Sequence, residues 1–209
     1  MFSDRAEAGE QLAGKLEHYR GQDAVVLALP RGGIVVGHKV ARALSLPLDI
    51  VVTRKIGHPG NPEYAVCAVD EHGALLCNEA EASLLDKAWL QKKAKEEQEE
   101  AQRRSIIYRR GREPIDLANK VAIIVDDGIA TGLTMRLAIV ATMAQHPKKV
   151  IVAVPVAASD AAQMIKREAD EVIILEPSEE FAGSVGLHYE QFEQIEDAEV
   201  IRLLRSMKQ

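Results

Sequence analysis

The sequence predicts an α/β protein with a doubly wound, mainly parallel sheet flanked by helices. Short apolar runs rich in β-branched residues recur along the chain, as at 24–29, 121–125 and 171–175, with helical patterns between them. Such runs are typical of strands buried on both faces. Their alternation with helices favours parallel strands joined by right-handed crossovers. The 209 residues suffice for one such domain and a small appendage.

The first part of the chain predicts two helices and two strands. Apolar residues at helical spacing in 3–19 indicate an amphipathic helix, which we expect Ser3 to cap. The expected elements after this helix are a strand at 24–29, a helix at 34–44 and a strand at 48–55. The second strand ends in two cations, and we expect them at the carboxyl edge of the sheet.

The middle of the chain predicts a loop, a hairpin and a long charged helix. Residues 57–64 hold two glycines and two prolines, so we expect no regular structure there. Residues 65–77 indicate a hairpin with its turn at 70–73. A helix over about 79–110, capped by Asn78, follows. It ends in a basic cluster that either helps to bind an anion or is a solvated helix end: Arg103, Arg104, Arg109, Arg110 and Arg112.

The last part of the chain changes character at residue 176. A strand at 148–157, a helix at 159–168 and a strand at 171–175 complete the α/β pattern. Residues 176–209 hold three of the chain's aromatic residues within a short span and end in an amphipathic helix. We therefore expect an α/β core over 1–175 and a small C-terminal hood over 176–209.

Composition excludes several classes of protein. A net charge of −6 and a pI near 5.6 argue against a protein that grips nucleic acid by its phosphates. No apolar run reaches the roughly 18 residues of a membrane span, and the N-terminus lacks a signal-peptide pattern, so we expect a cytoplasmic protein without membrane contact. Cys67 and Cys77 are the only cysteines, and we expect ordinary small residues rather than a disulfide or zinc site.

The most informative stretch is residues 121–134. A buried strand runs directly into Asp126 and Asp127, and a loop of small and hydroxylated residues then opens a helix that continues through Met143. Backbone N–H groups in such a loop, together with the helix N-terminus, form an anion site. Carboxylates repel a phosphate, so the acids suit vicinal hydroxyls or a hydrated magnesium ion. A ribose 5-phosphate offers all of these partners.

A second candidate phosphate loop follows the first strand. Gly32 and Gly33 let backbone amides approach phosphate oxygens without a Cβ in the way, and Arg31 supplies positive charge. A glycine pair after a strand is weak evidence alone, because many strand-to-helix turns need one. Because the glycine pair and the acid pair occur in one chain, each supports the interpretation of the other as part of a phosphate-binding site.

These two motifs resemble those of the type I phosphoribosyltransferases. The sequence DDGIATGLT matches the signature for phosphoribosyl diphosphate (PRPP), and PRGG resembles the turn that holds the diphosphate. The Ala-Thr-Gly sequence and the Arg54-Lys55 pair are closer to adenine-type enzymes, but the rest of the chain looks more like stand-alone phosphoribosyltransferase-like proteins of undefined acceptor. The resemblance implies that Asp126 and Asp127 are catalytic, bind the ribose hydroxyls and reach Mg²⁺ through water. The implied PRPP-binding residues are Arg31, Gly32, Gly33, Arg54, Lys55, Asp126, Asp127, Gly128, Ile129, Ala130, Thr131, Gly132, Leu133 and Thr134.

The resemblance also carries expectations for the surroundings of the site. It implies a cis peptide bond between Pro30 and Arg31, a mobile loop at 57–64 that closes over the reacting centre, and a homodimer. The hood would hold the acceptor base, with Phe181 and Tyr189 as candidates, although aromatic residues there are as readily explained as hood core. Ala130 stands where the 6-oxopurine enzymes carry an acid, which makes such an acceptor doubtful.

Two functions follow from the resemblance. One is Mg²⁺-dependent transfer of a 5-phosphoribosyl group from PRPP to a nitrogen base or related small acceptor, with release of diphosphate. The alternative is a non-catalytic regulatory protein that binds PRPP or a nucleotide and controls a partner. A nucleoside-triphosphate fold is disfavoured, because the chain has no Walker-type Gly-Lys-Ser/Thr sequence.

Overall fold

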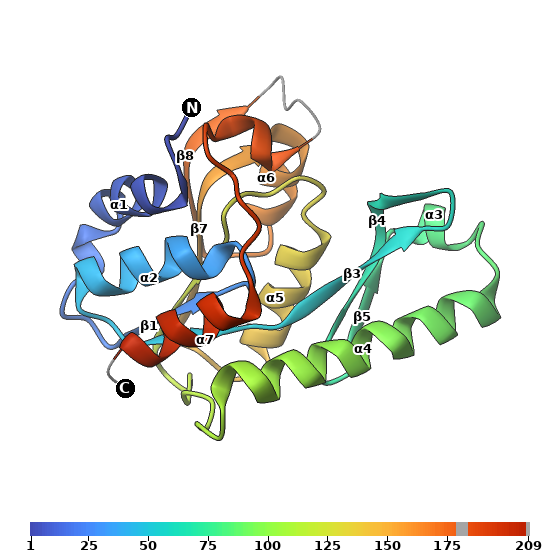
Figure 1. The fold of residues 1–209 in the computed structure, drawn as a ribbon, viewed down its shortest axis with the longest axis horizontal. Helices are drawn as coiled ribbons and strands as arrows, with labels where there is room; N and C mark the ends of the chain where they lie inside the picture. Colours follow the sequence, from blue (N-terminus) through green and yellow to red (C-terminus); the bar gives the residue numbers. More distant parts are fainter. Residues whose placement is uncertain (179–183, 208–209) are drawn as a thin grey trace.

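The computed structural model of the protein describes residues 1–178 and 184–207. Its core is a five-stranded parallel sheet in the order β2-β1-β6-β7-β8, as the sequence predicted (Figure 1). The order makes the sheet doubly wound, with the crossovers reversing direction between β1 and β6. The strands are β1 (Ala24–Ala28), β2 (Leu48–Ile50), β6 (Val121–Val125), β7 (Lys149–Ala158) and β8 (Glu171–Ser178).

Helices cover both faces of this sheet, which explains why its strands are apolar throughout. Alternate residues of a strand point to opposite faces, so Ile123 and Ile124 of β6 belong to different hydrophobic clusters. The first face is covered by α1 (Arg5–Lys15), α2 (Gly33–Leu44) and α7 (Asp197–Ser206), with η1 (Glu17–Tyr19) and part of α4. The second face is covered by α5 (Leu133–Met143) and α6 (Ser159–Ile165).

A small antiparallel sheet forms an arm that projects from the core (Figure 1). It consists of β3 (Thr53–His58), β4 (Asn61–Asp70) and β5 (Leu75–Cys77). Two predictions were wrong here. The strand expected at 48–55 breaks after Ile50, and its second half joins the arm; residues 57–64 are not irregular, because β3 and β4 form a hairpin through them. The turn predicted at 70–73 is confirmed.

The helix expected over about 79–110 is also interrupted. A short α3 (Glu79–Ala82) precedes α4 (Lys87–Arg109), which runs back along the arm to the core (Figure 1). The side chain of Asp86, rather than Asn78, caps the long helix by accepting from the Trp89 amide at 2.7 Å. Likewise Asp4, rather than Ser3, caps α1.

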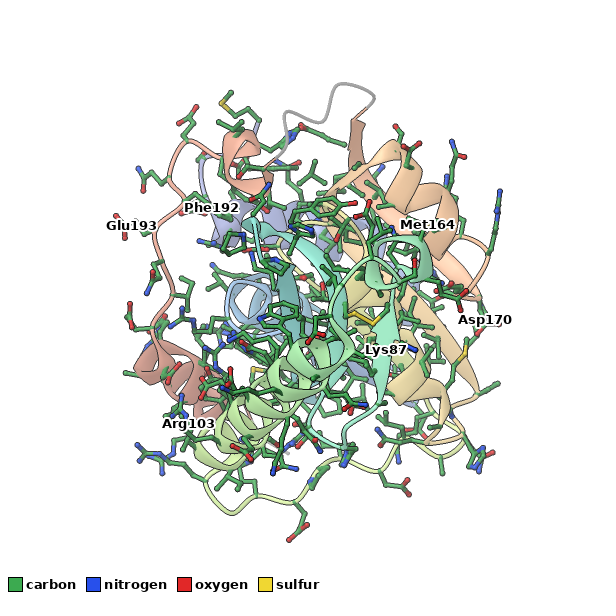
Figure 2. The ribbon with its side chains drawn as sticks, turned by 90° about the vertical axis from the view of Figure 1, so that its right-hand side faces the viewer. Lys87, Arg103, Met164, Asp170, Phe192 and Glu193 are labelled. Atoms are coloured by element: carbon green, nitrogen blue, oxygen red, sulfur yellow. A yellow bond between two sulfur atoms is a disulfide. The ribbon has the colours of Figure 1, made fainter. Side chains whose placement is uncertain are left out.

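Cys67 and Cys77 form a disulfide, so the prediction of two ordinary small residues was wrong. The two residues are directly opposite in the β4–β5 ladder, with their Cα atoms 4.0 Å apart. The bond is visible in Figure 2, which looks onto the end of the arm. The predicted hairpin already placed these residues near one another across the turn, and this was the signal for the pairing.

The N-terminal segment pairs with the residues that follow β8. Residues after β8 include η2 (Val185–His188) and lead to α7, which packs on α2 and α4. The N-terminal segment adds to them, because the Phe2 amide donates to the His188 carbonyl and the Phe2 carbonyl accepts from the Glu190 amide. No helix within 1–178 or 184–207 has the length and apolarity of a transmembrane segment.

The disulfide should stabilise the arm measurably. It closes a loop with a sequence separation of 10 residues, so Cys77→Ser should lower the free energy of unfolding by about 2–3 kcal/mol. Urea denaturation under non-reducing conditions measures this change. Reduction should destabilise the wild type by a similar amount and leave the variant unaffected. Two thiols reactive in the denatured, unreduced protein would contradict the disulfide.

Candidate active site

The predicted phosphate turn and the acid pair lie side by side at the centre of the sheet. Strands β1 and β6 are neighbours in register, with Ala28 opposite Val125, so the segments that follow them leave the sheet at the same point. This is the position where the strand order reverses, and ligands of open parallel sheets bind there. The structure thus brings together Arg31 and Asp126, which are distant in the sequence.

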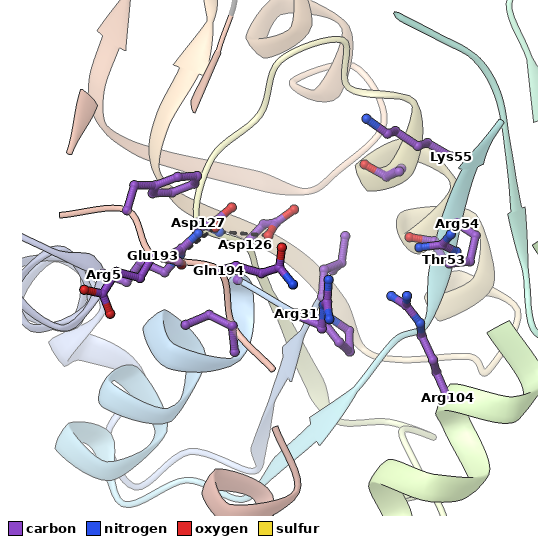
Figure 3. Close-up of a pocket in the computed structure, with 16 residues that line it drawn as sticks. Arg5, Arg31, Thr53, Arg54, Lys55, Arg104, Asp126, Asp127, Glu193 and Gln194 are labelled. Atoms are coloured by element: carbon purple, nitrogen blue, oxygen red, sulfur yellow. Dashed lines mark hydrogen bonds and ion pairs between the residues drawn. The ribbon is translucent and has the colours of Figure 1, made fainter. Parts of the chain in front are cut away.

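A cleft of about 540 Å³ opens above these two segments (Figure 3). Figure 3 shows Asp126 and Asp127 across from β3, which carries Arg54 and Lys55. The predicted residues that line the cleft are Arg31, Gly32, Arg54, Lys55, Asp126, Asp127 and Thr134. The other lining residues are Arg5, Leu29, Pro30, Thr53, Arg104, Phe192, Glu193, Gln194 and Ile195.

The two glycines of the turn are required by their distance from the acid pair. A Cβ on Gly32 would lie 1.8 Å from Oδ2 of Asp127, and a Cβ on Gly33 would lie 2.9 Å from the Asp126 Cα. Gly33 begins α2, whose N-terminus therefore points toward the cleft. The expected cis peptide bond between Pro30 and Arg31 is present.

The acid pair is held by the protein in two different ways. Oδ1 of Asp126 accepts from the Asp127 amide at 2.8 Å. Oδ2 of Asp127 accepts from Nε of Arg5 at 2.7 Å, an ion pair between side chains that are only 15% and 9% exposed. Burial raises the pKa of Asp126 well above its usual value, and the neighbouring Asp127 charge adds to this. Burial also raises the pKa of Asp127, against the opposing effect of Arg5.

The loop after the acid pair is anchored to the neighbouring strand. The Ile129 amide donates to the Val156 carbonyl, and the Ile129 carbonyl accepts from the Ala158 amide, so the loop is tied to the end of β7. Gly132 has φ +82°, a left-handed conformation that suits glycine, and α5 begins immediately after it. Thr134, in the first turn of α5, reaches the cleft.

The sequence similarities decide the family. Residues 5–190 match the phosphoribosyl transferase domain family. The chain belongs to this family. The earlier resemblance is thereby confirmed, and with it the expected fold.

Individual proteins are similar to this chain over most of its length. Two Mycobacterium tuberculosis proteins provisionally named as phosphoribosyl transferases, MT0597 and Rv0571c, are each 42% identical over 206 residues. The match covers 98% of this chain but 46% of theirs, so the chain spans about half their length. The crystal structure of TT1426 from Thermus thermophilus has a TM-score of 0.81 at 39% identity, covering 99% of this chain and 98% of that one. AQ2163 from Aquifex aeolicus shares the fold, with a TM-score of 0.51 at 12% identity over 83% of this chain and 73% of its own.

The predicted cations of this phosphoribosyltransferase-family cleft have protein partners. Arg54 forms an ion pair with Glu97 of α4, with Nη2 and Oε2 2.7 Å apart. Nη1 of Arg31 lies 3.8 Å from Oδ1 of Asp197, at the start of α7. Of the basic cluster on α4, Arg104 lines the cleft, whereas Arg109 binds Asp49 and the Ile50 carbonyl. The cluster therefore divides between the cleft and the attachment of α4 to the core.

The two candidate base-stacking residues are placed differently. Phe181 lies outside the described residues. Tyr189 is 5% exposed, packs with Phe2 and donates its hydroxyl to the Asp127 carbonyl. Tyr189 is thus part of the hood core, and its role toward an acceptor stays a prediction. Phe192 lines the cleft and, at 37%, is more exposed than Tyr189.

The acid pair fits a magnesium ion that shares ligands with a substrate. Within the described parts of the chain, no group of three or more His, Cys, Asp or Glu side chains could hold a metal ion. Mg²⁺ commonly takes one or two carboxylates from the protein and completes its shell with substrate phosphates and water. Asp126 and Asp127, both lining the cleft, supply such carboxylates.

Sequence reasoning missed the residues that the hood and the first helix add to the cleft. Arg5 is the clearest case, since its contact with Asp127 spans 122 residues of sequence. It sits in the first turn of an amphipathic helix, where a charged residue is ordinary. Phe192, Glu193 and Gln194 lie in an irregular segment between η2 and α7, for which no local pattern indicated a position.

The close approach at Gly33 predicts a large difference between two glycine substitutions. Gly33→Ala would press a methyl group against the backbone of Val125 and Asp126, and should lower the free energy of unfolding by about 1–3 kcal/mol. Gly14→Ala is the control, because no heavy atom lies within 4 Å of a Cβ there in α1, and it should stabilise by about 0.5–1 kcal/mol. Urea denaturation of both variants checks the contrast. Equal effects would show that the turn can move away from the acids.

Because the pKa of Asp126 is raised, Asp126→Asn should increase the thermal stability of the protein by an amount that depends on pH. In the wild type, the contribution of neutral Asp126 to the free energy of unfolding is fully present below the usual Asp pKa. This contribution is lost as pH rises through the raised pKa of the folded protein, because the partly buried carboxyl group must then ionise. The amide oxygen of Asn can still accept from the Asp127 amide. Scanning calorimetry in buffer that contains a metal chelator should therefore give the variant a higher Tm than the wild type at about pH 7–8. At about pH 3.5 the two proteins should have the same Tm.

The matched control is Asp127→Asn. It breaks the ion pair with Arg5 and leaves a buried guanidinium without its carboxylate, so no comparable gain is expected. A gain near neutral pH that is equal in the two variants would contradict the distinction drawn between the two acids.

Proposed function

We propose that the chain transfers a 5-phosphoribosyl group from PRPP to a small nitrogenous acceptor, with Mg²⁺ and with release of diphosphate. The observation that carries the proposal is the single cleft in which the Pro-Arg-Gly-Gly turn and the Asp126–Asp127 pair face the same space. Membership of the phosphoribosyl transferase family supports the reaction class. The cleft lies within a fold that this chain shares with TT1426 along nearly its whole length.

The charges in the cleft suit the two ends of PRPP. Besides Arg5, which is paired with Asp127, the lining has four cationic side chains, on Arg31, Arg54, Lys55 and Arg104; its carboxylates are those of Asp126, Asp127 and Glu193. The turn at 31–33, at the N-terminus of α2, would hold the diphosphate, and the loop at 128–134 would hold the 5-phosphate. The acid pair between them would accept hydrogen bonds from the ribose hydroxyls.

This arrangement would act mainly by positioning and by charge. Breaking the bond from ribose C1 to diphosphate leaves positive charge on the sugar and negative charge on the leaving group. Arg31, Arg54 and Lys55 line the cleft and would stabilise the departing diphosphate. Mg²⁺ held near Asp126 and Asp127 would neutralise further phosphate charge.

The acceptor would lie against the hood. Phe192, Gln194 and Ile195 line the cleft on that side, offering an aromatic ring, an amide and an aliphatic surface. These groups suit a flat heterocycle with hydrogen-bonding edges. Ala130 in place of an acid argues against a 6-oxopurine.

The proposal predicts saturable PRPP binding and acceptor-dependent release of diphosphate. Calorimetric titration with PRPP and Mg²⁺, followed by a diphosphate assay over a panel of purine, pyrimidine and pyridine bases, checks both. The double variant Asp126→Asn/Asp127→Asn should lower kcat/KM by at least about 100-fold, because both ribose contacts lose their charge. PRPP binding without turnover on any base would instead support the regulatory alternative. Absence of PRPP binding by the folded wild type would overturn both.

A further inference from the structure

We propose that Arg5 is a positioning residue that fixes the carboxylate of Asp127 for the ribose hydroxyls and joins the hood to the PRPP site. The inference rests on the proposed function, because it concerns the same cleft. Arg5 lies in the first turn of α1, far in sequence from both PRPP motifs. Its contacts with Asp127 and with the hood residues Phe192 and Glu193 carry the inference.

The backbone of Arg5 is held in place from both sides. On the N-terminal side, Phe2 is 1% exposed and pairs with the hood backbone, and the Ser3 carbonyl accepts from the Gln191 amide at 2.9 Å. On the C-terminal side, the capped first turn of α1 begins at Arg5 itself. The start of the Arg5 side chain is therefore fixed relative to the hood.

The Arg5 guanidinium is held along its edge and on one face. Nε donates to Oδ2 of Asp127 at 2.7 Å, and Nη1 donates to the Glu193 carbonyl at 2.8 Å. The face of the group lies over the Phe192 ring, with Cζ 3.6 Å from the ring centroid. Because a guanidinium is planar and its donors have fixed directions, these contacts set one orientation for the group.

The orientation of Arg5 fixes that of Asp127. The Asp127 carboxylate lies between the Arg5 guanidinium and Gly32, where a Cβ would come within 1.8 Å of Oδ2. The Asp127 backbone is held as well, since its carbonyl accepts from the Tyr189 hydroxyl. With Oδ2 committed to Arg5, Oδ1 is the oxygen through which Asp127 would accept a ribose hydroxyl. Figure 3 shows Arg5 beside Asp127 on the hood side of the cleft.

The role predicted for Arg5 differs from that of the other cations in the cleft. A cation that binds phosphate directly would contribute to the binding of diphosphate alone. Arg5 acts through Asp127, so its loss should weaken ligands that contain ribose and leave free diphosphate binding nearly unchanged. Lysine would keep the charge but lose the planar fork that joins Asp127 to Glu193.

Calorimetric titrations of Arg5→Gln and Arg5→Lys test this inference. The ligands are PRPP with Mg²⁺, ribose 5-phosphate without metal, and diphosphate. Arg5→Gln should weaken the binding of PRPP and ribose 5-phosphate by about 10- to 100-fold, by analogy with the loss of a residue that orients a metal ligand. Diphosphate affinity should change by less than about twofold, and Arg5→Lys should be intermediate. Arg20→Gln, which breaks an exposed ion pair with Glu17, is the matched control and should match the wild type.

A double-mutant cycle separates positioning from general destabilisation. If Arg5 acts through Asp127, adding Arg5→Gln to Asp127→Asn should cost no further ribose 5-phosphate affinity. Additive losses, equal losses for diphosphate, or unchanged affinity in a folded Arg5→Gln variant would each overturn the inference while the proposed function stands. If Arg5→Gln does not fold, the same comparisons apply to Arg5→Lys. Failure of the wild type to bind PRPP would overturn both proposals.

Discussion

The contact between the turn after β1 and the acids after β6 is the constraint on which the site depends. The two strands are paired in register, so the chain leaves both at the same height. A Cβ at Gly33 would then meet the backbone of Val125 and Asp126, and a Cβ at Gly32 would meet the Asp127 side chain in its present position. The sequence predicts that these glycines give phosphates access to the backbone. The close approach of the acid pair is a second reason for glycine in this turn.

This closeness also sets the electrostatics of the site. Two adjacent, partly buried carboxylates are costly to ionise together, and both pKa values are shifted upward, mainly by burial. The ion pair of Arg5 with Asp127 partly offsets that cost. Asp126 has no such ion pair among the described side-chain contacts, so it carries most of the penalty. Natural functional sites commonly accept such a cost in stability.

The central part of the fold and of the site could be predicted from the sequence because the signals there are local. The run at 121–125 ends directly in the acid pair, and the Pro-Arg-Gly-Gly turn follows another apolar run. The errors arose where pairing between segments decides the structure. Nothing local shows that the run at 48–55 leaves one sheet for another after Ile50. The disulfide likewise depends on which residues of β4 and β5 face each other.

The position of Arg5 shows why the rest of the site escaped sequence reasoning. An arginine in the first turn of an amphipathic helix has no distinguishing local pattern, and its partners lie 122 and 188 residues away. Its contacts depend on hood residues 184–195, which pair with the N-terminal segment and lie against the acid pair. A change in the hood that moves Phe192 or Glu193 therefore also acts on Asp127. In this protein the hood lining and the acid pair of the cleft share one guanidinium, so their geometries cannot vary independently.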